Sequence, residues 1–227
     1  PAYARYDCDL EKTVENLVDG SFFNSGQSCC GIERIYVDEK IYNNFLELFI
    51  SKTYNYKLGN PLEKETNLGP VVKLSAAEFI LKQMNSAMDK GAKKMIDENK
   101  FIYPKEHKNY LIPQVLTNVN HDMSFMTEET FGPCVGIMKV RDENEAIKLM
   151  NDSPYGLTAS IWTKDIEIAE EIGNKVETGT FYMNRCDYLD PALSWTGVKE
   201  TGKGCSLSEV AYEKLTSPKS FHLRKEQ

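Results

Sequence analysis

Apolar positions along this chain recur with two different spacings, one typical of helices and the other of strands. Leu10, Val14, Leu17 and Val18 lie on one face of a helix that Asp9 can cap. The same helical spacing predicts further helices at 41–54, 75–90, 143–151 and 165–174. Shorter apolar or β-branched runs predict strands at 34–37, 94–96, 110–119, 135–140, 158–163, 179–183 and 220–224.

The order of these segments indicates the fold class. Strands that alternate with helices are typical of an α/β protein, so we expect a mostly parallel sheet with flanking helices. Pro113 interrupts the run at 110–119, which predicts an edge strand or a bulge there. A chain of 227 residues can bury a sizeable core, and no repeat or low-complexity linker divides it. One domain is therefore the simplest prediction.

Charge and hydropathy exclude several classes of partner. The chain has a net charge of −7, and its 27 basic residues form no dense cluster, which argues against nucleic acid and against a polybasic membrane patch. No apolar run approaches the roughly 20 residues of a membrane helix, and no signal peptide opens the chain. Because the first residue is Pro1 and not methionine, we expect the chain to be cut from a longer one.

The cysteines and histidines indicate a reducing compartment and no metal site. Six cysteines show neither a CxxC pair nor the spacing of a disulfide framework, so we expect free thiols and a cytoplasmic protein. The three histidines are scattered and match no metal-ligand pattern.

The stretch 21–31, SFFNSGQSCCG, is the strongest candidate for chemistry. It places Cys29 and Cys30 after a Gly-Gln-Ser turn, where a thiol can be exposed and activated as a thiolate. Free cysteines are also among the most buried residues, and two phenylalanines precede this pair, so core packing is the alternative.

Three segments resemble one known family. FFNSGQSC at 22–29 resembles the catalytic-cysteine signature of the aldehyde dehydrogenase superfamily. TEETFGPCVGIMKV at 127–140 and NDSPYGLTASIWT at 151–163 resemble two further segments of that family. Together they identify the chain as similar to the catalytic-cysteine half, with the cofactor-binding half absent. The resemblance implies a catalytic domain at 1–219 and an oligomerisation strand at 220–227.

The resemblance also assigns candidate roles to single residues. Cys29 takes the position of the nucleophile, with Ser28 and Cys30 as its neighbours in the aldehyde pocket. Glu129 and Phe131 take the positions that hold the nicotinamide ribose and line the nicotinamide ring. Without the resemblance, these two would be interpreted as a solvated acidic turn and a core phenylalanine.

The segment 184–195 resembles the family loop that walls the aldehyde tunnel. The resemblance places Cys186, Leu189 and Trp195 against the substrate. Leu189 stands where many members have an aromatic residue, and Arg185 and Asp187 add charge. Arg185 either favours an aldehyde that carries a carboxylate or simply pairs with the neighbouring aspartate.

The implied function is NAD- or NADP-dependent oxidation of an aldehyde to a carboxylic acid through a cysteine thiohemiacetal and thioester. The implied partners are a small aldehyde and further copies of the chain, as a homodimer or larger homo-oligomer. The asparagine that holds the oxyanion and the general-base glutamate of the family lie before Pro1. We therefore expect the isolated chain to be inactive.

Other interpretations remain open. The stretch 197–204, GVKETGKG, nearly matches a phosphate-binding loop, but Gly204 stands where a hydroxyl is needed, so a structural turn is favoured. A cysteine hydrolase requires a histidine beside Cys29, and His107, His121 and His222 lie in unrelated segments. A non-catalytic folding and oligomerisation module is the third alternative.

Overall fold

The computed structural model describes residues 1–104, 106–186 and 188–225. Its strands are β1 (Ala2–Ala4), β2 (Arg34–Asp38), β3 (Lys93–Lys94), β4 (Gln114–Thr117), β5 (Cys134–Val140), β6 (Tyr155–Gly156), β7 (Thr158–Trp162), β8 (Thr180–Met183), β9 (Trp195–Thr196), β10 (Val198–Lys199) and β11 (Cys205–Ser206). Its helices are α1 (Leu10–Phe22), α2 (Tyr42–Thr53), α3 (Leu74–Asp89), α4 (Ser124–Thr127), α5 (Glu143–Asn151), α6 (Ile166–Gly173) and α7 (Val210–Leu215), with 3-10 turns η1 (Phe23–Gly26) and η2 (Glu98–Lys100).

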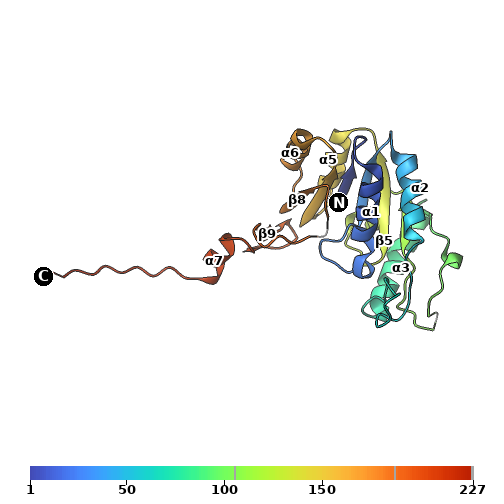
Figure 1. Cartoon of the computed structure of the whole chain (residues 1–227), viewed down its shortest axis with the longest axis horizontal. Helices are drawn as coiled ribbons and strands as arrows, with labels where there is room; N and C mark the ends of the chain where they lie inside the picture. Colours follow the sequence, from blue (N-terminus) through green and yellow to red (C-terminus); the bar gives the residue numbers. More distant parts are fainter. Residues whose placement is uncertain (105, 187, 226–227) are drawn as a thin grey trace.

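A seven-stranded sheet forms the centre of the molecule. Its strand order is β3-β4-β5-β2-β1-β7-β8, and every pairing is parallel except β3 with β4. Helices cover both faces, with α1 and α2 packed side by side (Figure 1). The predicted α/β class with a mostly parallel sheet is therefore confirmed.

The two faces of the sheet bury separate cores. Successive side chains of a strand point to opposite faces, so Tyr3 packs in one core while Ala2 and Ala4 pack in the other. The same division separates Tyr36 from Ile35 on β2. Phe45 and Phe49 of α2 are fully buried against the second face.

Most predicted elements form within one or two residues of their expected bounds. Asp9 caps α1 by accepting a hydrogen bond from the backbone N–H of Lys12 at 3.3 Å. The run at 110–119 shortens to β4, and the prediction of an edge strand or bulge there is wrong. β4 lies between β3 and β5, and Pro113 precedes its first residue, so the missing N–H lies outside the strand.

β1 was not predicted, although it lies near the middle of the sheet. Its sequence is Ala-Tyr-Ala, and three residues are too few to show a period. All three side chains are fully buried, and small alanines let α1 approach that face. Its place in the sheet comes from pairing with β2 and β7, which a local pattern does not reveal.

The predicted strand at 220–224 is wrong for the single chain. Residues 216–224 form neither helix nor strand and extend away from the sheet as the C-terminal arm (Figure 1). A strand requires a hydrogen-bonded neighbour, and nothing in the described part of this chain lies beside the arm to supply one. Residues 226 and 227 of the predicted oligomerisation strand lie outside the described residues.

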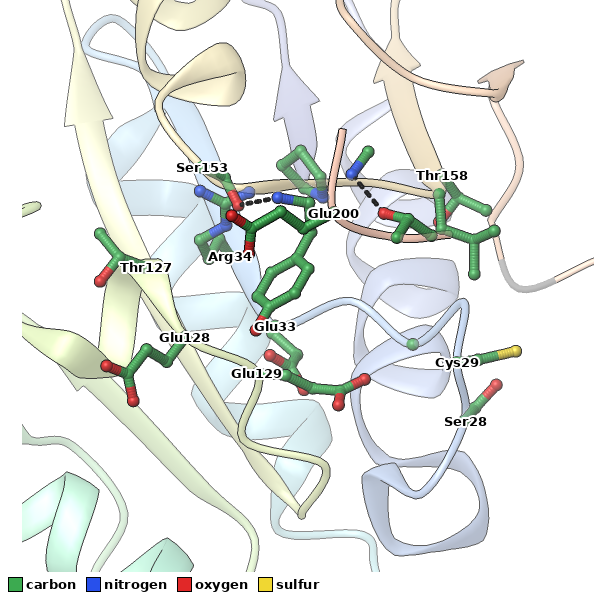
Figure 2. A pocket seen from close by; sticks show the side chains of 16 residues that line it. Ser28, Cys29, Glu33, Arg34, Thr127, Glu128, Glu129, Ser153, Thr158 and Glu200 are labelled. Carbon is green, nitrogen blue, oxygen red and sulfur yellow. Dashed lines mark hydrogen bonds between the residues drawn. The ribbon is translucent and has the colours of Figure 1, made fainter. Parts of the chain in front are cut away.

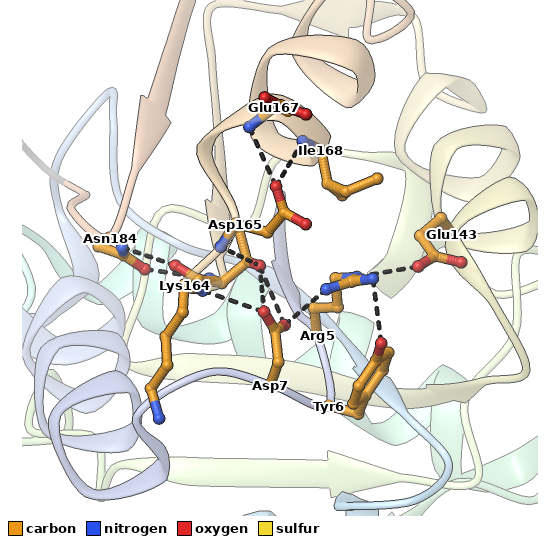
Figure 3. A network of polar contacts seen from close by, with 10 residues as sticks. Arg5, Tyr6, Asp7, Glu143, Lys164, Asp165, Glu167, Ile168 and Asn184 are labelled. Carbon is orange, nitrogen blue, oxygen red and sulfur yellow. Dashed lines mark hydrogen bonds and ion pairs between the residues drawn. The ribbon is translucent and has the colours of Figure 1, made fainter.

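A polar cluster closes the carboxyl ends of β1 and β7 (Figure 3). The Arg5 guanidinium pairs with Glu143 at 2.9 Å and with Asp7 at 3.0 Å. Asp7 also accepts hydrogen bonds from the Thr163 hydroxyl and the Lys164 N–H. Burial acts to raise the pKa of Asp7, but these three partners together hold it below its usual value. The hydrogen bond from Arg5 likewise lowers the pKa of Glu143.

Replacing Arg5 tests this cluster. Arg5→Leu leaves the Asp7 carboxylate without its cation, so we expect a loss of about 3 kcal/mol in the free energy of unfolding near pH 7. Both carboxyl pKa values are lowered in the folded chain, so their stabilisation is present above their unfolded pKa and lost as the pH falls. The variant should therefore lose less stability than wild type between about pH 5 and pH 2.

The control is Arg141→Leu, which breaks the exposed pair with Glu145. Solvent screens that pair, so its loss should change the free energy of unfolding far less than the loss of Arg5. Urea unfolding at a series of pH values gives both quantities. Equal losses for the two variants would contradict the structural role of Arg5.

Candidate functional site

The turn after α1 is a reversal built from left-handed residues. Asn24 has a φ of 50°, Ser25 of 59° and Gly26 of 70°. Asparagine and glycine tolerate this region, whereas a serine there requires support from its surroundings. The turn directs the chain away from the axis of α1, so Ser28 and Cys29 follow outside the helix.

The loop at 67–72 supports this turn through hydrogen bonds to Ser25 and Gln27. The Ser25 hydroxyl donates to the Gly69 carbonyl at 2.7 Å. Gln27 accepts from the Val72 N–H at 2.8 Å, and its side-chain amide donates to the Asn24 carbonyl at 3.0 Å. The Gln27 of the signature therefore fixes the backbone just before Cys29.

Gly26 also makes the closest backbone approach in this region. A Cβ at this position would lie 2.1 Å from the carbonyl oxygen of Gly132. Only glycine fits, both for this reason and because of its positive φ. The contact places the turn at 23–29 directly against the segment 128–133.

The two adjacent cysteines have different surroundings. Cys29 is exposed, whereas Cys30 is buried and its sulfur lies 3.4 Å from the Ser28 hydroxyl. Cys134 is buried as well, and burial raises the pKa of its thiol well above the usual value. Of the two alternatives for this pair, core packing therefore describes Cys30, and Cys29 is accessible to a reactant.

The second predicted pair of residues lies on an exposed turn. Glu129 is exposed, and Phe131 is 39% exposed with a left-handed φ of 54°. Phe131 is therefore not the core phenylalanine of the alternative interpretation, whereas an exposed Glu129 is what that interpretation also expected. The carboxylate of Glu33 accepts hydrogen bonds from the backbone N–H groups of Thr130, at 3.0 Å, and Phe131, at 2.8 Å.

Glu33 was missed by the sequence reasoning. It is a single acidic residue before a strand, and no spacing distinguishes it from a solvated carboxylate. In the structure it is half-buried, and burial raises its pKa, although the hydrogen bonds from Phe131 and Thr130 act in the opposite direction.

The two turns border one open cavity of about 310 Å³. Its lining includes Ser28 and Cys29 from the first turn, Glu33 and Arg34 at the start of β2, and Glu129 from the second turn. The segments 153–158 and 200–201 complete it. Figure 2 shows Cys29 at one side of the pocket, Glu128 at the opposite side and Glu129 between them.

The parallel sheet explains why these segments meet. The Cys29 turn precedes β2 and the Glu129 turn precedes β5, and the two strands are parallel neighbours. The segment before β7 lies at the same end of the sheet, because β1 pairs in parallel with both β2 and β7. The cavity therefore lies at the amino ends of the strands.

The structure places the predicted tunnel residues elsewhere. Cys186 packs against Gly20 of α1, and its thiol donates to the Asn16 carbonyl at 3.5 Å. Leu189 is 49% exposed, and Trp195 is half-buried in β9. None of the three lines the 310 Å³ cavity.

Of the two charged residues predicted to matter in this loop, the structure describes only Arg185. The guanidinium of Arg185 lies 3.2 Å from the centre of the Tyr188 ring, so a cation–π contact holds it. Asp187, its predicted alternative partner, lies outside the described residues.

The glycine-rich stretch at 197–204 has structural contacts. β10 pairs with β6, and the Lys199 ammonium donates to the carbonyls of Asn151 at 2.7 Å and Ser153 at 3.1 Å. Lys199 also pairs with Glu177 at 2.8 Å. These contacts support the prediction of a structural turn, because the lysine is held by the chain itself.

No histidine lines the cavity. His121 is held between the Tyr36 hydroxyl and Asp152, each at 2.8 Å. Within the described ranges, no group of three or more His, Cys, Asp or Glu side chains is arranged to bind a metal ion. No helix in the described part of the chain has the length and apolar character to cross a membrane.

Comparison with known proteins adds independent information on sequence and structure. Residues 1–221 match the model of the aldehyde dehydrogenase family. The chain is 34% identical to the 3-sulfolactaldehyde dehydrogenase of Priestia aryabhattai over 211 residues, which are 92% of this chain and 43% of that protein. It is 32% identical to aldehyde dehydrogenase 1A1 of Oryctolagus cuniculus over 225 residues, covering 99% of this chain and 45% of that protein.

The fold is also similar to that of known aldehyde dehydrogenases. The structure superposes with a TM-score of 0.88 on the betaine aldehyde dehydrogenase of Staphylococcus aureus solved in complex with NAD+, at 32% identity, over 94% of this chain and 43% of that one. The chain thus spans less than half the length of the relatives it matches. Sequence and fold together show that this chain belongs to the aldehyde dehydrogenase family.

Proposed function

We propose that the native protein oxidises a small aldehyde to the carboxylic acid, with Cys29 as the nucleophile and NAD or NADP as the hydride acceptor. One observation carries this proposal: the exposed Cys29 thiol and the exposed Glu129 carboxylate border the same cavity. Buried Cys30 and Cys134 cannot meet a substrate without a rearrangement.

The residues of the second turn are suited to a nicotinamide cofactor. An ionised carboxylate such as Glu129 is an acceptor with two oxygens and can bind both hydroxyls of a ribose. Phe131 offers partly exposed apolar surface next to it. A bound nicotinamide ring supplies the hydride acceptor.

The chemistry at Cys29 follows from its thiol. The thiolate attacks the aldehyde carbon and forms a C–S bond, which gives a thiohemiacetal oxyanion. We assign the donation to this oxygen to the backbone N–H of Cys29, which is next to the sulfur. Loss of hydride from the same carbon leaves a thioester on Cys29. Water then cleaves the C–S bond, releasing the acid and the thiol.

Self-association is a second proposal, carried by the C-terminal arm. Phe221 is 71% exposed and Leu223 is 86% exposed, although a single chain usually buries such residues. We infer that the arm docks on another copy of the chain, either by adding a strand to a sheet edge or by packing its apolar side chains.

The state of the cysteines supports the expected cytoplasmic location. No two of these six cysteines, all of which lie in the described ranges, are joined by a disulfide, and a reducing compartment would keep them so.

The reactivity of the thiols tests the assignment of the nucleophile. Limiting iodoacetamide on the folded protein should label Cys29 before Cys30 and Cys134, because only the first of these is exposed. Mass spectrometry of the fragmented peptide separates the two neighbours. First labelling of Cys30 or Cys134, with the folded circular dichroism spectrum unchanged, would contradict the assignment.

Turnover tests the reaction itself. In the native protein, Cys29→Ala should lower NADH production from an aldehyde and NAD by at least about 10³-fold, because no other group replaces the nucleophile. Cys205→Ala is the matched control, since Cys205 is also a free thiol but does not line the cavity. Loss of activity in both variants, or in neither, would count against Cys29 as the nucleophile.

Sedimentation equilibrium tests the second proposal. We expect the chain to sediment as a dimer or larger species at micromolar concentration, and the double variant Phe221→Asp, Leu223→Asp to shift it toward the 25.9 kDa monomer. Ser217→Asp with Ser220→Asp adds the same charge at polar positions of the arm and should have little effect. A wild-type chain that is monomeric throughout would rule out self-association.

A further inference from the structure

Glu33 connects the start of β2 to the turn at 129–131. It lies four positions after Cys29 and directly before β2. Its own carbonyl accepts a hydrogen bond from the Gly136 N–H of β5 at 3.0 Å, so its backbone is fixed by the central sheet. From this fixed base its side chain reaches the turn before β5.

One of the hydrogen bonds that Glu33 accepts comes from a residue with a strained backbone, Phe131. Phe131 adopts the left-handed region, which is unfavourable for a residue other than glycine and persists only where the surroundings enforce it. The Phe131 N–H donates to Oε1 of Glu33 at 2.8 Å. The Thr130 N–H lies 3.1 Å from Oε1 and 3.0 Å from Oε2, so both oxygens are used.

These contacts set the direction of the residues on either side. Thr130 is buried, while Glu129 and Phe131 are exposed, and Glu129 lines the cavity. Fixing two consecutive N–H groups fixes the peptide planes from which both exposed side chains project. Hydrogen bonds to an ionised group are shorter and stronger than neutral ones, which suits an anchor of this kind.

We propose that Glu33 is a positioning residue that holds the turn at 129–131 and thereby aims the Glu129 carboxylate and the Phe131 ring at the cofactor. Resting on the function proposed above, this role extends the site to a carboxylate that acts through the backbone of the turn at 129–131. Both carboxylate oxygens of Glu33 accept backbone hydrogen bonds from this turn.

Removing the carboxylate gives three expected results in the native protein. In Glu33→Ala, the Thr130 and Phe131 amides should exchange with deuterium at least about tenfold faster, since their acceptor is lost. The dissociation constant for NAD, measured by quenching of protein fluorescence, should rise about tenfold. The rate at which iodoacetamide labels Cys29 should stay within about twofold, because the turn at 23–29 has its own supports.

Glu33→Gln provides a graded second variant that keeps the size of the side chain. Its amide oxygen still accepts one hydrogen bond, so exchange and the NAD dissociation constant should lie between those of wild type and Glu33→Ala. If the Glu33→Ala variant fails to fold, Glu33→Gln alone tests whether Glu33 anchors and positions the turn.

Glu145→Ala is the matched control. Glu145 likewise accepts a backbone N–H, that of Arg141 at 2.8 Å, but it lies beyond the opposite end of β5. Its removal should leave the Thr130 and Phe131 amides and the NAD dissociation constant unchanged.

The exchange measurement separates this inference from the proposed function, because it needs no cofactor. Unchanged exchange at Thr130 and Phe131 in both Glu33 variants would overturn the anchoring role, whatever the protein does. Faster exchange with an unchanged NAD dissociation constant would overturn the positioning role alone. A wild-type protein that binds neither NAD nor NADP would instead overturn the proposed function, and the positioning role with it.

Discussion

The close approach of Gly26 to Gly132 is the constraint on which the candidate site depends. A side chain at position 26 would collide with the Gly132 carbonyl, so the turn that carries Cys29 can rest on the turn that carries Glu129 only because Gly26 has none. Glu33 adds a polar connection between the start of β2 and the turn at 129–131. Because no side chain separates the two turns, the Cys29 thiol and the Glu129 carboxylate border one cavity although they lie far apart in the sequence.

The sheet makes this approach possible. β2 and β5 run parallel and adjacent, so the loops that precede them emerge at the same edge. Ligands of open α/β sheets usually bind at the carboxyl ends of the strands, whereas here the cavity lies at the amino ends. At the other end of the sheet, Arg5 and its two carboxylates tie β1 to β7 and α5, and this polar cluster stabilises the fold without taking part in the site.

Local sequence patterns predicted most of the fold but only part of the site. The spacing of apolar residues predicted the helices and the longer strands, because each of them buries the face on which those residues lie. β1 has no period to detect, and the arm shows no pairing within one chain. Cys29, Glu129 and Phe131 were found through a family resemblance, and the structure adds the exposure of all three and the cavity that Cys29 and Glu129 share. Glu33 carries no signal in the sequence, since its role comes from two N–H groups almost a hundred residues later.

Trapping the covalent intermediate tests the central claim most directly. The native protein, mixed with an aldehyde substrate and NAD and quenched in acid during turnover, should carry an acyl group as a thioester on Cys29. Mass spectrometry of the fragmented peptide distinguishes Cys29 from Cys30 by the position of the added mass. An acyl group on Cys29, absent when NAD is omitted, is the predicted result. Turnover with the acyl group on another residue, or with no acyl group on any cysteine under conditions where hydrolysis limits the rate, would contradict the assignment.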